Sequence, residues 1–283
     1  MNVGIIGFGF VGKALKSSFN NKVNYKIIDP NLKTNIDDLV PLSPNIVFVC
    51  VPTPMNDDGT QNIKILKKVI DELEEKLKNT KIVIKSTVLP DYLNELSKKN
   101  IKLVYNPEFL RESFANNDFI NAKFILFGST NDNYSNELSE FYKCFTNCKT
   151  NDYIKTDLLT ASLVKYTINS YLASKVVFFN ELFEVFSSLN HDVGWDNFIK
   201  ILQMDPRIGS SHMEVPGHDG MKGFGGACFP KDINALYDFS VKKEKSMDIL
   251  KYVISKNNTI RKSYNKTTER EKEQNINFDT NQD

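Results

Sequence analysis

The chain has 283 residues, and its 36 Lys and Arg balance 35 Asp and Glu, so the net charge of +1 gives no reason to expect nucleic acid or an anionic membrane as the main partner. With 41% hydrophobic and 25% charged residues it is typical of a folded protein, of two domains or one large one. No apolar run approaches the ~18 residues that cross a bilayer, and the first residues lack the features of a signal peptide. Four cysteines are too few for a disulfide scaffold. We therefore expect a cytoplasmic protein.

In residues 1–152, short apolar runs alternate with helix-like stretches. Such runs, bounded by Gly, Pro, Asn or Asp, are typical of strands buried on both faces of a sheet. They lie at residues 3–6, 25–28, 46–51, 82–84, 103–105 and 124–127. Residues 63–77 place apolar side chains at helical spacing. The alternation predicts an α/β domain with a Rossmann-like, doubly wound parallel sheet.

The second half has a different texture. Residues 156–188 contain no Pro or Gly and are rich in apolar residues, which predicts a helix approaching ~50 Å in length. We expect residues 153–260 to form an all-helical domain built on this helix, with a Gly-rich loop between Gly217 and Gly226. Residues 261–283 are polar and predict a flexible tail.

Gly7-Phe-Gly9-Phe10-Val11-Gly12 follows the first expected strand and opens a helix. In this pattern the glycines allow a tight turn, close approach of a pyrophosphate and close helix packing, and the helix N-terminus holds the phosphates. Asp29 ends the second strand, where a carboxylate accepts from the ribose hydroxyls and repels a 2′-phosphate, so the pattern favours NAD over NADP. The glycine pattern alone could also form a turn that binds no ligand. The strand before it, the helix after it and Asp29 together favour a dinucleotide-binding site. Lys33 is a further candidate contact, or a solvated surface lysine.

Cys228 has the most informative setting of the four cysteines. It follows several glycines and precedes Pro230, which suits the first turn of a helix, with Lys231 and Asp232 next. A helix N-terminus and an adjacent lysine lower the pKa of a thiol, so we expect a reactive thiolate, with a buried structural cysteine as the alternative. Cys50 lies in an apolar run and is expected in the core. No histidine or cysteine spacing indicates a metal site.

Three further groups of polar residues suit carbonyl chemistry. Lys165 and Asn169 are one helical turn apart and could stabilise an oxyanion, although a solvated helix surface explains this pair equally well. Glu108 and Glu112 follow an expected strand end. Ser86-Thr87 lies at another strand end, where open α/β sheets concentrate ligand contacts.

Together these motifs resemble the UDP-glucose/GDP-mannose dehydrogenase family. The resemblance rests on the Gly7–Gly12 loop, Cys50-Val-Pro-Thr53-Pro, Lys85-Ser-Thr87, Asn106-Pro-Glu108-Phe-Leu-Arg-Glu112 and Gly223-Phe-Gly-Gly-Ala-Cys228-Phe-Pro-Lys-Asp232, and on Lys165 to Asn169 in the long helix. It covers about residues 1–260.

The resemblance implies oxidation of the C6 alcohol of a nucleotide sugar to the carboxylate, with reduction of two NAD+. Cys228 would capture the aldehyde as a thiohemiacetal that becomes a thioester. Lys165 and Asn169 would stabilise the oxyanions. Asp232, Thr87 and Glu108 would organise the water that acts as base and later hydrolyses the thioester.

The same resemblance implies the binding residues and a homodimer formed largely through the long helix. Arg207 would reach the substrate across the dimer interface. NAD would be contacted by Gly7, Gly9, Phe10, Val11, Gly12, Asp29, Lys33, Thr53, Thr87, Glu112 and Lys231. The nucleotide-sugar substrate would be contacted by Glu108, Phe109, Leu110, Arg111, Lys165, Asn169, Arg207, Met213, Pro216, Gly217 and Gly225.

UDP-glucose is the expected substrate, with GDP-mannose and UDP-N-acetylhexosamines as alternatives. Family members usually continue into a second α/β domain that binds the nucleotide, and this sequence ends where that domain would begin. We therefore expect the domain to be absent, with the long loop from Pro216 to Gly223 as a candidate replacement for its contacts. Two other functions remain open: a non-catalytic or partner-dependent NAD-binding homologue, and a related 3-hydroxyacid dehydrogenase, against which the Cys228 segment argues.

Overall fold

The computed structural model describes residues 1–190, 192–264 and 266–278. The chain divides into two compact units. The N-terminal unit comprises Met1–Thr53 and Asn62–Lys165, and the C-terminal unit comprises Pro54–Gln61 and Tyr166–Asp283. The division therefore falls inside the long helix, and the short segment Pro54–Gln61 belongs to the C-terminal unit although its sequence lies between two elements of the sheet domain.

The N-terminal unit is built on a seven-stranded sheet with the order β2-β1-β3-β4-β5-β6-β7. The strands are β1 (Asn2–Ile6), β2 (Asn24–Ile28), β3 (Ile46–Val49), β4 (Lys81–Ile84), β5 (Lys102–Tyr105), β6 (Ile125–Gly128) and β7 (Tyr153–Thr156). The first six confirm the six apolar runs. Burial favours apolar residues along β1, β3, β4, β5 and β6, whereas the edge strand β2 is buried only at its end. The edge strand β7 was not predicted; its side chains are only partly buried, so its sequence has no apolar run.

The sheet is not entirely parallel, and this corrects the prediction. β6 pairs with β5 in the antiparallel direction, through Tyr105 and Gly128, while the other pairings are parallel. A buried four-residue run looks the same in both directions. Strand direction is decided by the path of the connecting chain, here residues 106–124, and the apolar pattern does not record that path.

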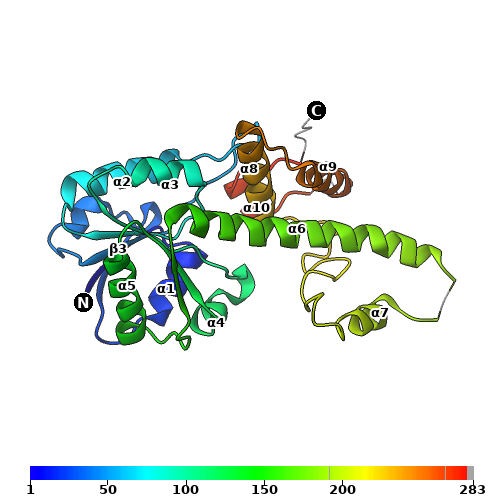
Figure 1. The fold of residues 1–283 in the computed structure, drawn as a ribbon, viewed down its shortest axis with the longest axis horizontal. Helices are drawn as coiled ribbons and strands as arrows, with labels where there is room; N and C mark the ends of the chain where they lie inside the picture. The colour runs from blue at the N-terminus through cyan, green and yellow to red at the C-terminus, as the bar shows by residue number, and fades with distance from the viewer. Residues whose placement is uncertain (191, 265, 279–283) are drawn as a thin grey trace. The chain divides into compact units, whose positions relative to one another are not determined.

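Helices cover both faces of the sheet (Figure 1). On one face, α2 (Lys64–Lys76) and α3 (Pro90–Leu96) contribute Leu66, Ile70 and Leu93 to one apolar cluster. On the other, α1 (Phe10–Ser18), α4 (Ala115–Ile120) and α5 (Asp132–Phe145) pack Leu15 and Phe141 into a second. Short 3-10 helices lie at Pro30–Leu32, Ile36–Leu39 and Glu112–Phe114. The doubly wound architecture is confirmed.

The strand order reverses at β1, which has β2 on one side and β3 on the other. In open α/β sheets, ligands bind beyond the carboxyl ends of the strands at this switch point. The segments that leave those ends are 7–12 after β1, 50–53 after β3 and 85–87 after β4, and all three contain residues that the sequence singled out.

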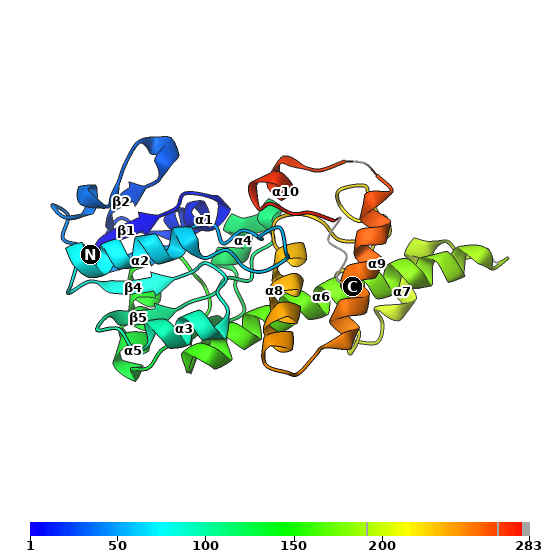
Figure 2. The ribbon, with the colours of Figure 1, turned by 90° about the horizontal axis from the view of Figure 1, so that it is seen from above.

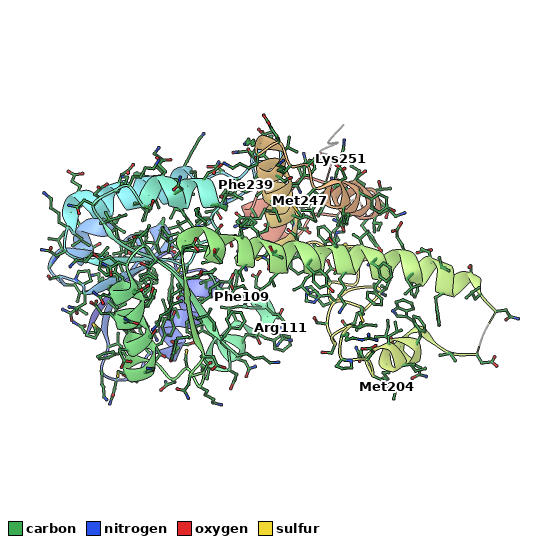
Figure 3. The ribbon with its side chains drawn as sticks, in the orientation of Figure 1. Phe109, Arg111, Met204, Phe239, Met247 and Lys251 are labelled. Carbon is green, nitrogen blue, oxygen red and sulfur yellow. The ribbon has the colours of Figure 1, made fainter. Side chains whose placement is uncertain are left out.

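The C-terminal unit is helical. The long helix α6 (Leu158–Ser188) begins in the N-terminal unit and continues into this one, as its lack of Pro and Gly predicted. It is followed by α7 (Trp195–Leu202), α8 (Phe229–Lys242), α9 (Asp248–Lys262) and α10 (Glu269–Glu273), and α8 packs against α9 (Figure 2). Trp195 packs with Phe179, Phe183 and Phe186 in an aromatic cluster, whereas Met204, beyond α7, projects outward (Figure 3).

The polar C-terminal segment differs from the flexible tail that its composition predicted. Its residues 269–273 form α10, which begins with a capping box between Thr268 and Glu271. Glu271 is completely buried. Composition failed here because Glu271 is held by Gly226, which lies outside the segment, and by Arg261 of α9, and because Ile276 is buried as well. Residues 279–283 of the expected tail, and His191, lie outside the described residues.

Candidate active site

Two of the three glycines after β1, Gly7 and Gly12, lie where a side chain would clash with the backbone. Gly7 has a φ of +90°, and a Cβ there would lie 2.6 Å from the carbonyl oxygen of Cys50. A Cβ on Gly12 would lie 2.2 Å from the carbonyl oxygen of Gly7. Gly9, in contrast, precedes α1 with no atom within 4 Å of a Cβ position. The loop therefore packs tightly on one side and leaves open space at the start of α1, as a phosphate-binding turn requires.

Asp29 lies against this loop at the end of β2. Its Oδ2 accepts from the amide of Phe8 at 2.7 Å, and its Oδ1 accepts from the amide of Asn31 at 2.9 Å. Each carboxylate oxygen has lone pairs left for a ribose hydroxyl. Lys33 follows in an exposed, left-handed conformation. The predicted juxtaposition of Asp29 with the glycine loop is present.

Thr53 and Thr87 follow the neighbouring strands β3 and β4 and are joined by a hydrogen bond. The Oγ1 of Thr53 donates to the carbonyl oxygen of Thr87 at 3.0 Å, and both residues are buried. Ser86 donates from its hydroxyl to the carbonyl oxygen of Val51 at 2.6 Å. These bonds tie together the two segments that leave the sheet beside the glycine loop.

Glu108 and Lys165 form a buried ion pair in the N-terminal unit. The Lys165 Nζ lies 3.7 Å from the Glu108 Oε1, and the amide of Leu110 donates to Oε2 at 2.6 Å. The Lys165 ammonium also lies 5.4 Å from the ring centre of Phe109. A buried cation held in this way is suited to stabilise a developing oxyanion.

The next residues on this segment are exposed. Arg111 makes a two-pronged contact with Asp118, which holds the pKa of that carboxyl below its usual range through the hydrogen bonds from Arg111. Figure 3 shows Phe109 and Arg111 projecting from the chain that follows β5. Glu112 is also exposed, in the 3-10 turn that follows.

A buried polar group behind Glu108 escaped the sequence analysis. Lys85 directly follows β4 and donates to the side-chain oxygen of Asn106 at 3.1 Å, and Tyr142 donates to the same atom at 2.6 Å. Burial lowers the pKa of Lys85 and raises that of Cys50 to about 12. Lys85 thus holds the start of the segment that carries Glu108. In the sequence, the lysine that directly follows an apolar strand was the signal that could have revealed this buried group.

In the C-terminal unit, Asp232 lies at the centre of a second polar cluster. Asn169 on α6 donates from Nδ2 to the Asp232 Oδ2 at 2.6 Å, and the Lys231 Nζ lies 2.5 Å from Oδ1. Asp232 is 1% exposed, and both partners are buried. Asn169 follows Lys165 by one turn of α6, which agrees with the predicted shared face. Its amide has a second N–H, so contact with Asp232 leaves one donor for a ligand.

Cys228 lies at the N-cap of α8, confirming the predicted position. The amide of Asp232 donates to its carbonyl oxygen at 3.0 Å, and Pro230 lies in the first turn. The Cys228 thiol is not in a disulfide, and the residue is partly exposed. Cys50, expected in the core, is also only partly buried and packs against the second apolar cluster. A thiol at a helix N-terminus next to a lysine and a carboxylate is a setting for a nucleophile.

The predicted substrate segment between α7 and α8 is held by internal contacts. Lys175 on α6 donates to the carbonyl oxygen of Ile208 at 2.9 Å, and Arg207 forms an exposed pair with Asp205. The Met213 side chain is buried in the aromatic cluster, so its backbone is the part left for a ligand. Pro216 is exposed.

Two family models match the chain. The NAD-binding domain of the UDP-glucose/GDP-mannose dehydrogenase family matches residues 31–146, and the central domain of the same family matches residues 159–259. The chain belongs to the UDP-glucose/GDP-mannose dehydrogenase family.

Relatives agree with this family. A UDP-glucose 6-dehydrogenase of Rickettsia felis is 34% identical over 218 residues, which cover 75% of this chain and 47% of the relative. The chain thus spans about half the length of the curated relatives it matches. The structure is similar to that of a UDP-glucose dehydrogenase of Pyrobaculum islandicum, with a TM-score of 0.76 and 23% identity, over 90% of this chain and 67% of that one. It is also similar to that of a UDP-D-ManNAc dehydrogenase of Pyrococcus horikoshii, with a TM-score of 0.73 and 18% identity, over 93% of this chain and 69% of that one.

Membership in the family assigns NAD as the cofactor of the N-terminal unit, and the residues there fit it. The open space at Gly9, the start of α1 and the Asp29 carboxylate offer the phosphate and ribose contacts that a dinucleotide needs. Within the described residues, no helix is both long and apolar enough to span a bilayer, and no group of His, Cys, Asp or Glu could hold a metal ion.

The predicted residues of the family site are distributed over both units. In the N-terminal unit the structure joins Thr53 to Thr87 and Glu108 to Lys165. In the C-terminal unit it joins Asp232 to Asn169 and Lys231, at the start of the helix that Cys228 caps. The pairings of Lys85 with Asn106 and of Lys231 with Asp232 were not predicted.

Proposed function

We propose that the protein catalyses NAD-dependent oxidation of the C6 alcohol of a nucleotide sugar to the carboxylate, with UDP-glucose as first substrate and UDP-glucuronate as product. The observation that carries this proposal is the position of Cys228 at the start of α8, next to the buried cluster of Asp232, Lys231 and Asn169. The comparisons support a nucleotide sugar, and the relatives' names include both UDP-glucose and UDP-D-ManNAc.

NAD+, held at the glycine loop and Asp29, would supply the hydride acceptor for the two oxidations of C6. In the first oxidation, the O6 proton passes to a water that the Asp232 carboxylate orients, and an aldehyde forms. The Cys228 thiolate then attacks C6: the S–C bond forms, and the carbonyl π electrons move to the oxygen as an oxyanion. Lys165 and the second N–H of Asn169 stabilise this charge.

The second oxidation converts the thiohemiacetal on Cys228 into a thioester. Water, deprotonated by the Asp232 carboxylate, adds to the thioester carbonyl and expels the thiolate, which regenerates Cys228 and releases the sugar carboxylate. Covalent capture keeps the aldehyde on the protein between the two oxidations. Thr53, Thr87, Glu112 and Lys231 are proposed contacts of the nicotinamide half of NAD.

The remaining contacts bind the sugar nucleotide. We assign them to Glu108–Arg111, the backbone of Met213 to Gly217, and Gly225. Arg207, exposed beyond α7, suits a substrate contact made across a homodimer. Exposed Tyr171, Phe178 and Val185 recur at seven-residue intervals on α6 and would be covered in such a dimer. A monomeric mass by light scattering would count against this assembly.

The stoichiometry of the reaction tests the proposal. Purified protein with excess NAD+ and limiting UDP-glucose is expected to form two NADH per sugar, because both oxidations occur before release. UDP-D-ManNAc and GDP-mannose, supplied separately, show whether another sugar nucleotide is preferred. One NADH per sugar would mean that the aldehyde escapes capture. Measurable NAD binding without NADH from any of the three sugars would refute the proposed activity for this chain alone and favour a non-catalytic or partner-dependent homologue.

A further inference from the structure

Glu271 lies beyond the part of the chain that the family models match, which ends at residue 259. It is nevertheless among the most buried charged residues, with no exposed surface, and its carboxylate has four donors. Two are local: the amide and hydroxyl of Thr268 donate to Oε2 at 2.7 and 2.9 Å and cap α10. Two are distant: the amide of Gly226 and the Nη2 of Arg261 donate to Oε1, both at 3.0 Å.

The Gly226 contact reaches the loop that carries Cys228. Gly226 has a φ of +77°, and a Cβ on the preceding Gly225 would lie 2.3 Å from both the Arg261 guanidinium and the Glu271 Oε1. The backbone therefore rests directly on this ion pair, two and three residues before the cysteine. Glycine is required here because the charged pair occupies the space of a side chain.

Other side chains bind the same loop at residues that precede Gly225. Asn180 accepts from the amide of Gly223 at 3.0 Å, and Asn257 accepts from the amide of Phe224 at 2.7 Å. Arg261 continues to Asp219 at 2.7 Å. Among these anchors, Glu271 makes the contact nearest to Cys228 along the chain. Moving a carboxylate out of water has a desolvation cost, which the four donors to Glu271 offset. A flexible tail would leave this carboxylate in water, so its burial indicates a specific conformational role.

We propose that Glu271 is a positioning residue, which fixes the backbone of Gly225 and Gly226 and thereby holds Cys228 at the start of α8 for attack on the substrate. The inference rests on the proposed function for its catalytic consequence. The contact itself is independent of that function. The proposal thus assigns a role in the chemistry to the C-terminal segment, through the contact of Glu271 with the loop that precedes Cys228.

The test compares Glu271→Gln with Glu273→Gln, the same change on the same helix at an exposed position. Gln has a single acceptor oxygen, so it cannot satisfy Gly226, Arg261 and Thr268 together. Hydrogen exchange of the peptide covering residues 221–228 is expected to accelerate by about tenfold in Glu271→Gln and to stay unchanged in Glu273→Gln. Alkylation of Cys228 by iodoacetamide, measured against Cys144 in the same sample, is expected to slow by about threefold because the thiol leaves the helix N-terminus.

Activity is the third measurement. Glu271→Gln is expected to lower kcat about tenfold and to leave the KM for NAD+ within about twofold, because misplacement of the nucleophile affects the chemical step and not cofactor binding. Unchanged exchange, equal acceleration in both variants, or unchanged Cys228 alkylation would each overturn the inference. Absence of NADH in the wild type would refute the proposed function, and exchange and alkylation would still decide the positioning role.

Two further samples cover the case in which Glu271→Gln does not fold. Gly225→Ala disturbs the same contact from the loop side and is expected to give the same pattern of exchange and alkylation. In the unmodified protein, amides 222–226 are expected to be protected; exchange at the rate of an unstructured peptide would overturn the inference.

Discussion

Cys228→Ala is expected to reduce steady-state formation of UDP-glucuronate by about 10³-fold or more, because the aldehyde can no longer be held as a thiohemiacetal. The first oxidation needs no thiol, so the variant is expected to form at most one NADH per sugar, with free aldehyde as product. NADH absorbance together with product analysis by mass spectrometry measures both quantities.

Cys144→Ala is the matched control, because Cys144 is an exposed cysteine of α5 with no proposed role. It should retain the wild-type rate and the stoichiometry of two. Cys50 is unsuitable as a reactive control, since burial raises the pKa of its thiol to about 12 and keeps it protonated near neutral pH. Two NADH per sugar at the wild-type rate in Cys228→Ala would eliminate covalent capture from the mechanism.

Asp232→Asn is expected to lower both activity and stability. The substitution places an amide donor against the buried Lys231 ammonium, which then lacks its counter-charge. Breaking a buried ion pair in this way costs about 3–5 kcal/mol of unfolding free energy. Because we propose that the Asp232 carboxylate orients the reactive water, its loss is expected to reduce kcat by about 10²- to 10⁴-fold. Urea unfolding and steady-state kinetics measure the two effects separately.

Asp238→Asn provides the comparison on the same helix. Asp238 pairs with Lys242 one turn away, where the lysine is largely exposed, and a pair of this kind contributes about 0–1 kcal/mol. Its stability and kcat should remain close to wild type. If Asp232→Asn loses stability while the folded fraction keeps its full kcat, Asp232 has a structural role alone, and another group must act on the water.

Local sequence determined the elements and the positions of the motifs. Five of the apolar runs became β1 and β3 to β6, where burial along the strand favours apolar residues, and the sixth became the partly exposed edge strand β2. The long helix α6 followed from the absence of Pro and Gly, and the start of α8 after Cys228 followed from Pro230. Gly7, Gly12 and Asp29 were identifiable because a dinucleotide-binding turn needs glycines and an acidic residue at fixed, short spacings in the sequence.

Tertiary structure alone decided the remaining features. The direction of β6 depends on the path of the connecting chain, and edge strand β7 has no apolar run to reveal it. The partners of buried charges are separated by long stretches of sequence: Asn169 reaches Asp232, and Glu271 reaches Gly226. The sequence around a charged residue in a polar segment does not show whether its side chain is exposed to water or buried in the protein. Its environment is set only when the distant donors that satisfy it are brought together by the fold, and local sequence carries no record of that encounter.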